Sequence, residues 1–138
     1  MIQISTDKTR LDIDLIHQYL SKESYWAIGR DIEIVKRSID NSLCFGLYID
    51  DKQIGFARVV TDYAIFAWIM DVFILKDYRA KGYGKKLMNA IMTHEKLQNL
   101  QRWGLGTEDA HGLYEQFGFK PLSKPQNMME KKIEIVRE

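Results

Sequence analysis

The spacing of apolar residues divides the chain into short strands and amphipathic helices. Ile2 and Ile4 alternate with a polar residue, which is typical of a short first strand. Apolar residues then recur at helical spacing over residues 10–21, and again, three and four apart, from Ile32 to about Asn41. The N-terminal third is therefore predicted to be one strand followed by two helices.

Two further apolar stretches, Leu43 to Ile49 and Gln53 to Val60, flank a polar turn and predict a β-hairpin. A longer apolar run from Ile65 to Leu75, interrupted only by Asp71, fits a central strand. A helix, a strand, a short helix and a last strand are expected after it, over residues 84–98, 101–105, 108–117 and 128–136. No repeat or linker interrupts this order, so we expect one domain over residues 1–138.

Composition and charge narrow the class of protein. The 138 residues are 46% hydrophobic and 28% charged, which is ordinary for a globular chain. The net charge of +1 argues against a nucleic-acid-binding protein, and no apolar run approaches the ~20 residues of a membrane span. A single cysteine, Cys44, and three scattered histidines leave no metal site to expect. The polar N-terminus is unlike a signal peptide, so we expect a cytoplasmic protein.

The stretch from Asp71 to Lys86 carries the clearest chemical signal. An apolar strand leads into a loop with glycines at positions 82 and 84, and an amphipathic helix follows at once. Free N–H groups at a helix N-terminus bind anions, and cationic side chains gather around this loop. A tight turn would also use the glycines. The ATP-binding pattern GxxxxGK[ST] and the third glycine of a dinucleotide site are both absent, which points to another carrier of pyrophosphate.

A second candidate region runs from Glu108 to Phe119. Tyr114 is either an acid towards a basic leaving group or a core residue of the short helix. His111 is either a base or an ordinary helix residue. Glu108 and Asp109 are either acids near the chemistry or groups that stabilise the helix N-terminus. Asp71, inside its apolar run, faces either a site or solvent.

These two regions together resemble the GNAT superfamily of N-acetyltransferases. The loop Arg79-x-x-Gly82-x-Gly84 is similar to the family's Q/R-x-x-G-x-G/A motif. Ala110-x-x-Leu113-Tyr114 with the following Gly118-Phe119 is similar to its A-x-x-L-Y-x-x-x-G-F segment, in the family's order and separation. The resemblance implies a mixed α/β fold: a mostly antiparallel sheet, flanked by helices and splayed between its fourth and fifth strands.

The resemblance also implies acetyl-CoA as co-substrate, with its pyrophosphate on the glycine loop and its pantetheine arm along the preceding strand. The residues assigned to acetyl-CoA in this way are Val72, Phe73, Ile74, Arg79, Ala80, Lys81, Gly82, Tyr83, Gly84, Lys85 and Thr107. Thr107 stands where many members have asparagine. Ala80 replaces a common glycine, with little consequence expected if its backbone conformation is regular.

In the family's mechanism an amine attacks the acetyl carbonyl directly, and Tyr114 matches the tyrosine that protonates the departing thiolate. The amine must lose a proton first, and Asp71, Glu108 and His111 remain open as the base. The acceptor is an amine of a small molecule or peptide, and the residues expected to bind it are Tyr25, Trp26, Arg30 and Arg58. Packing in the hydrophobic core explains Tyr25 and Trp26 about as well as substrate binding does. A homodimer is a possible oligomeric state. The alternative function is a non-catalytic CoA-binding or regulatory module.

Overall fold

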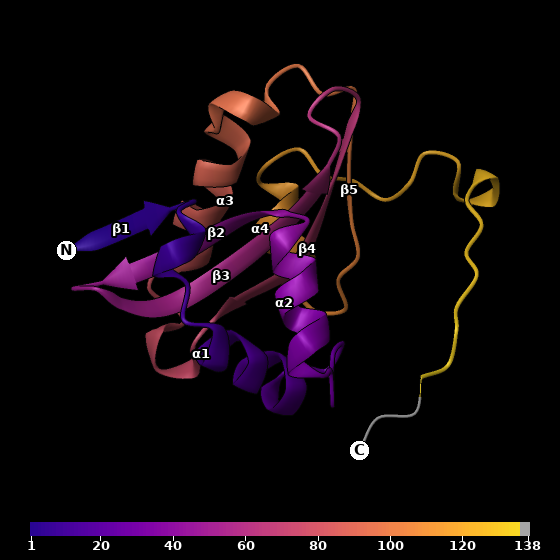
Figure 1. The fold of residues 1–138 in the computed structure, drawn as a ribbon. Coiled ribbons are helices and arrows are strands. Elements are labelled where there is room, and N and C mark those ends of the chain that lie inside the picture. Colours follow the sequence, from indigo (N-terminus) through magenta and orange to yellow (C-terminus); the bar gives the residue numbers. More distant parts are fainter. Residues whose placement is uncertain (136–138) are drawn as a thin grey trace.

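The computed structural model describes residues 1–135, and a five-stranded mixed sheet lies at its centre (Figure 1). The strands are β1 (Ile2–Ser5), β2 (Leu43–Ile49), β3 (Lys52–Thr61), β4 (Phe66–Ile74) and β5 (Arg102–Leu105). They lie in the order β1-β2-β3-β4-β5, with antiparallel pairs up to β4 and a parallel pair between β4 and β5. This mixed, mostly antiparallel sheet confirms the predicted fold class.

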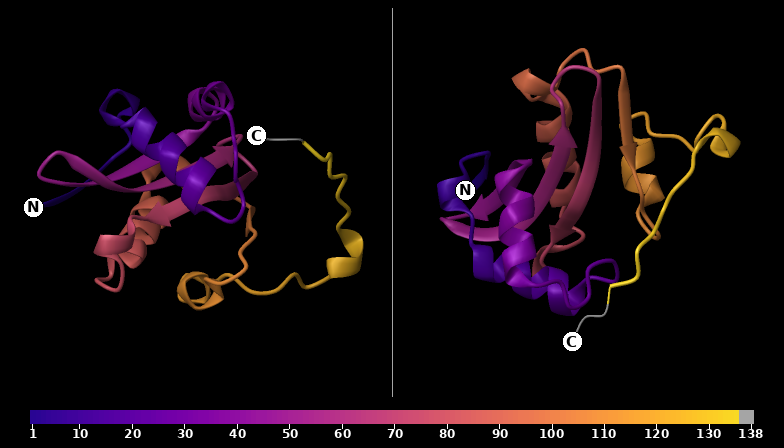
Figure 2. Two further views of the ribbon diagram at one scale, coloured as in Figure 1. Left: turned by 90° about the horizontal axis from the view of Figure 1, so that it is seen from below. Right: turned by 45° about the vertical axis from the view of Figure 1, so that its right-hand side comes forward.

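Helices cover both faces of the sheet (Figure 2). The longer helical segments are α1 (Ile13–Gln18), which continues into the π-helical turn η2 (Tyr19–Glu23), α2 (Ile32–Asp40), α3 (Tyr83–Thr93) and α4 (His111–Glu115). Short 3₁₀ turns are η1 (Lys8–Arg10), η3 (Lys76–Tyr78), η4 (Glu95–Leu97) and η5 (Pro125–Asn127). One core cluster joins the sheet to α1 and α2, and the other joins it to α3 and α4. No helix of the described residues is long and apolar enough to cross a membrane.

The predicted last strand is wrong over the described residues. Residues 128–135 form no strand, and Val136 lies outside the described residues. After η5 the chain instead continues as an extended arm that stands away from the sheet in both views (Figures 1 and 2). Apolar and polar residues alternate in this segment, as in a strand, but no strand of the described residues pairs with it.

A β-bulge in β4 places Asp71. Phe56 of β3 pairs with Phe73, and Arg58 pairs with Met70, so β4 carries one extra residue between these two pairs. Asp71 takes a φ of 55°, in the left-handed region that Asp tolerates better than most residues. An extra residue shifts the side-chain alternation by one. Ile69 therefore packs towards α3, whereas Phe73 packs towards α1 and α2.

The sheet opens between β4 and β5. The parallel pairing begins at Phe66 with Arg102 and ends at Ile69 with Leu105, although β4 continues to Ile74. Gly104 allows the close approach of the two strands, because a Cβ there would lie 2.3 Å from the ring of Trp68. Beyond Ile69 the strands separate, as the predicted splay between strands 4 and 5 requires.

Candidate active site

A cavity of about 570 Å³ lies where β4 and β5 separate. Three segments far apart in sequence form most of its wall: the loop before α2, the middle of β4, and the loop from β5 into α4. The lining residues are Tyr25, Trp26, Arg30, Trp68, Ile69, Met70, Asp71, Val72, Gly106, Thr107, Glu108, Asp109, Ala110, Tyr114 and Lys132. The opening of the sheet thus brings the predicted substrate loop, the central strand and the tyrosine segment to one place.

Tyr114 lies on α4 with its ring in the core and its hydroxyl directed to this cavity. The side chain is 8% exposed, and its ring packs edge-on against Phe119. The hydroxyl has no hydrogen-bond partner among residues 1–135. Burial, followed by the nearby Tyr25 and Asp109, raises the pKa of Tyr114 to about 12. The group is therefore a protonated donor with nothing to donate to in the described part of the chain.

Asp71 also lines the cavity, and three donors hold its carboxylate. Its Oδ2 accepts hydrogen bonds from Arg30 Nη1 and Arg58 Nε, each at 2.9 Å. Its Oδ1 accepts one from Trp26 Nε1, also at 2.9 Å. The carboxylate is almost completely buried, so the bulge of β4 serves to turn a charged group towards the loop before α2.

The remaining candidates for the base occupy different environments. Glu108 lines the cavity, is exposed, and has no ion pair with a described residue. Its backbone N–H donates to the Tyr25 hydroxyl at 2.8 Å, which ties the β5–α4 loop to the loop before α2. His111 is exposed at the first turn of α4 and is not part of the cavity wall.

The glycine loop before α3 presents free backbone donors. None of the N–H groups from Ala80 to Lys85 has an acceptor within the part of the chain that the structure describes. Gly82 is the N-cap of α3, with a φ of 82°, and no side chain caps the helix. A Cβ on Gly82 would meet nothing within 4 Å, so the space above the loop is open. These free donors fit a pyrophosphate.

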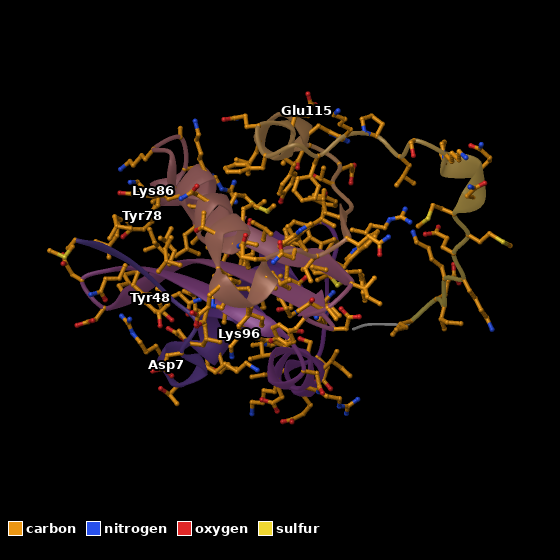
Figure 3. The ribbon with its side chains drawn as sticks, turned by 90° about the horizontal axis from the view of Figure 1, so that it is seen from above. Asp7, Tyr48, Tyr78, Lys86, Lys96 and Glu115 are labelled. Atoms are coloured by element: carbon orange, nitrogen blue, oxygen red, sulfur yellow. The ribbon has the colours of Figure 1, made fainter. Side chains whose placement is uncertain are left out.

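The cationic side chains around this loop are of two kinds. One is hydrogen-bonded within the protein, and the others are exposed. Arg79 folds back beneath the loop, donating from Nε to the Ile74 carbonyl at 3.0 Å and from Nη2 to the Tyr19 hydroxyl at 2.6 Å. Lys81 and Lys85 are exposed and form no ion pair with described residues. Figure 3 shows Lys86 and Tyr78 towards the end of α3 that carries the loop, and Lys96 towards the other end.

Ala80 stands where the family commonly has glycine, and little consequence was expected if its backbone conformation were regular. Its φ of 62° is not regular for alanine. A non-glycine residue in this left-handed region costs roughly 1–2 kcal/mol. The loop therefore retains the geometry that a glycine would supply, at a cost in backbone strain.

Other predicted residues take supporting positions. Phe73 is buried in the core and stacks on Tyr19 at 4.0 Å, so only its backbone is available to a ligand. Thr107 accepts the Ala110 N–H at 3.1 Å and thereby shapes the turn into α4. Arg58 does not line the cavity; it also donates to the Ser42 hydroxyl at 3.1 Å and so positions Asp71 from behind.

Sequence reasoning assigned no role to some of the cavity wall. Trp68 and Met70 belong to the apolar run that predicted β4, and the alternation of side chains along a strand places both on one face. Asp109, a candidate acid beside Glu108, lines the wall as well. Lys132 belongs to the C-terminal arm, and no sequence pattern indicated that it would lie near the site.

A sheet that opens after four antiparallel strands, with a glycine loop at one end and a tyrosine at the opening, is the architecture that the resemblance to N-acetyltransferases implied. The family model for the acetyltransferase (GNAT) domain matches residues 40–121, and the chain belongs to this family of acetyltransferases.

Similar proteins agree with this assignment. A crystal structure of a Xanthomonas campestris pv. campestris protein placed in the GNAT family is 49% identical, covers 96% of this chain and 94% of its own, and superposes with a TM-score of 0.94. A Gibberella zeae protein with a provisional acetyltransferase name is 29% identical and covers 80% of this chain and 74% of its own length. An uncharacterized N-acetyltransferase from Gracilaria tenuistipitata var. liui is 30% identical over 76% of this chain and 68% of its own.

Proposed function

We propose that this chain transfers the acetyl group of acetyl-CoA to a primary amine, with Tyr114 as the general acid. The observation that carries the proposal is the protonated Tyr114 hydroxyl, which has no hydrogen-bond partner among residues 1–135 and lies where β4 and β5 separate. The loop from Arg79 to Lys85 would hold the pyrophosphate through its free N–H groups. The backbone of Val72 to Ile74, on the edge of β4 that β5 no longer covers, would receive the pantetheine arm.

In the transfer step the amine nitrogen bonds to the acetyl carbon and the carbon–sulfur bond breaks. The departing thiolate takes a proton from the Tyr114 hydroxyl, and the second proton that the amine nitrogen loses on becoming an amide returns to the tyrosinate through solvent. A free thiol has a pKa of about 8.5, far below that of Tyr114, so the transfer would be uphill in water. Burial raises the pKa of thiols as well, however, and in this protein it raises that of Cys44 to about 11. A thiolate shielded from water by the bound substrates would therefore be better matched to Tyr114 than a thiolate in water.

We assign the first proton transfer, from the ammonium form of the acceptor, to Glu108. It lines the cavity and is free of ion pairs with described residues, whereas His111 lies outside the wall. Asp71 is already committed to two arginines and a tryptophan, so we assign it a positioning role. A water chain between Glu108 and the amine would serve the same purpose.

Binding of acetyl-CoA is expected to raise the melting temperature. At a ligand concentration of 100 Kd, a ligand specific to the folded state adds about 2.7 kcal/mol of stability. For a chain of this size that corresponds to an increase on the order of 10 °C, measurable by differential scanning calorimetry.

A matched pair of glycine variants separates ligand binding from backbone strain. Gly82 and Gly118 both have positive φ, and a Cβ on either meets nothing within 4 Å. Gly82→Ala and Gly118→Ala should therefore lose similar stability, but only Gly82→Ala should weaken the shift caused by acetyl-CoA. A melting curve that neither acetyl-CoA nor CoA moves would contradict the assignment of the loop.

A further inference from the structure

The buried charges beside the cavity do not balance. Arg30 and Arg58 both reach the same oxygen of Asp71, so two cations share one carboxylate. No other carboxylate of the described residues lies within ion-pair distance of either guanidinium. The side chains are 13%, 9% and 1% exposed for Arg30, Arg58 and Asp71. The cluster therefore carries one excess positive charge in a position where water screens it poorly.

The excess charge resides on Arg30. Arg58 is fully engaged: its Nε donates to Asp71, its Nη1 to the Ser42 hydroxyl, and its Nη2 lies 3.5 Å from Met70 Sδ. Arg30 donates only from Nη1, and its Nε and Nη2 have no acceptor among residues 1–135. Because Arg30 lines the cavity and Arg58 does not, the free donors of Arg30 are available to a ligand there.

We propose that Arg30 binds a carboxylate of the acceptor, so that the substrate is an amine that also carries a carboxylate. This inference rests on the proposed function. Asp71 and Arg58 fix the orientation of the Arg30 guanidinium, whose planar fork matches a carboxylate in two parallel hydrogen bonds. Trp26 also donates to Asp71, so the indole is fixed beside the same group and forms an apolar wall.

The acidic residues of the cavity wall distinguish this ligand from a phosphorylated one. Glu108 and Asp109 line the wall on the β5–α4 loop, and neither has an ion pair with a described residue. Lys132 is a second cation in the wall, so the lining has two cations and two carboxylates besides the Asp71 that Arg30 contacts. A wall with both signs of charge is complementary to a zwitterion such as an amino acid or a short peptide, and less so to a doubly charged phosphate.

The test compares amino acids with their amides as acceptors, at saturating acetyl-CoA. Each pair presents the same amine, with and without a carboxylate. Charged hydrogen bonds contribute about 1.5–3 kcal/mol, so the acids should show a kcat/KM roughly 10- to 100-fold higher than the amides. Arg30→Gln should abolish this preference by lowering the value for the acids alone, and Arg30→Lys should restore part of it.

Two controls keep failure of this inference distinct from failure of the proposed function. Arg30→Gln should retain the stabilisation by acetyl-CoA, because Arg30 lies outside the glycine loop, and its own melting curve reports whether it folds. If amides and acids are acetylated equally well, or if Arg30→Gln lowers both equally, the carboxylate site is wrong although acetyl transfer stands. If no amine is acetylated and acetyl-CoA does not stabilise the chain, the proposed function itself fails.

The C-terminal arm carries a second, independent inference. In an extended segment, residues 129, 131, 133 and 135 lie on one face, and three of them are the apolar Met129, Ile133 and Ile135. These three are 96%, 68% and 64% exposed, whereas the alternate residues are mostly charged. This alternation is typical of a strand with one buried face. In the structure, however, the apolar face of the arm is exposed to solvent.

We infer that the arm, residues 128–135, pairs with β5 of a second copy of this chain. β5 is the edge strand of the sheet, and β4 is its only partner among the described residues. An unpaired edge strand is a template for another strand. The arm offers a bare apolar face in an extended conformation, and β5 offers an unpaired edge, so each supplies what the other lacks. If two copies exchanged their arms, the arm would gain a partner strand and the edge of β5 would be paired.

Light scattering coupled to size-exclusion chromatography tests the exchange. The wild type is expected to have the mass of a dimer, and Ile133→Lys combined with Ile135→Lys that of a monomer. Both isoleucines are exposed within the chain, so this variant should fold. The control combines Lys132→Glu with Glu134→Lys on the other face and should remain dimeric. A monomeric wild type, or a double isoleucine variant that stays dimeric, would overturn the inference.

Discussion

Replacing Tyr114 with phenylalanine is expected to lower kcat by about 10²- to 10⁴-fold, the usual contribution of a general acid. Phenylalanine fills the same space in the core between α4 and Phe119, so the fold and the affinity for acetyl-CoA should be unchanged. Steady-state rates of CoA release, together with melting curves in acetyl-CoA, measure the two quantities separately. Tyr63→Phe is the matched control, because that hydroxyl is exposed and lies outside the cavity wall.

The pH dependence gives an additional readout. Because the pKa of Tyr114 is about 12, the hydroxyl keeps its proton up to and beyond pH 10 and should cause no fall in kcat there. In the unfolded chain the same group ionises near its ordinary pKa of about 10. Its contribution to stability is therefore fully present below about pH 10 and is lost as the pH rises towards 12. An unchanged kcat in Tyr114→Phe, with chemistry rate-limiting, would remove Tyr114 from the acid role.

The second large effect is expected from Asp71→Asn, which should destabilise the fold by about 3–5 kcal/mol. Removing one member of a buried ion cluster leaves the others uncompensated, which accounts for this magnitude. Here two arginines would lose their shared carboxylate. Asparagine tolerates positive φ as aspartate does, so the substitution tests the charge and not the backbone of the bulge.

Urea unfolding measures this change, with Asp77→Asn as the control. Asp77 is exposed in η3, so its substitution should stay within about 0.5 kcal/mol of the wild type. A loss below about 1 kcal/mol in Asp71→Asn would show that Arg30 and Arg58 do not depend on the carboxylate. The wild-type ion cluster would then be no stronger than an exposed pair.

Most of the fold could be predicted from local patterns. The strand over Leu43–Ile49 was predicted with the observed bounds, and the hairpin partner and the central strand differ by one residue at their ends. These elements are near-continuous apolar runs with polar turns on either side. The last strand failed because a period of two reports only that a segment suits a sheet. It does not report whether a partner strand lies within reach in the same chain.

The site was predicted less completely, because its decisive features are contacts between distant residues. The glycine loop and Tyr114 belong to contiguous motifs and could be found in the sequence. The bond of Asp71 to Arg30 spans 41 residues and depends on a bulge that no local pattern indicates. The positive φ of Ala80 is likewise set by the loop, since alanine itself does not favour it.

The most direct test of acetyl transfer to an amine is mass-spectrometric detection of product. The wild type is incubated with acetyl-CoA and a mixture of amino acids, their amides, short peptides and simple amines. The expected result is at least one acetylated amine, formed with an equal amount of free CoA and lost in Tyr114→Phe. If acetyl-CoA stabilises the protein and yet no amine is acetylated, the chain is a CoA-binding module without this activity, and the proposed function is contradicted.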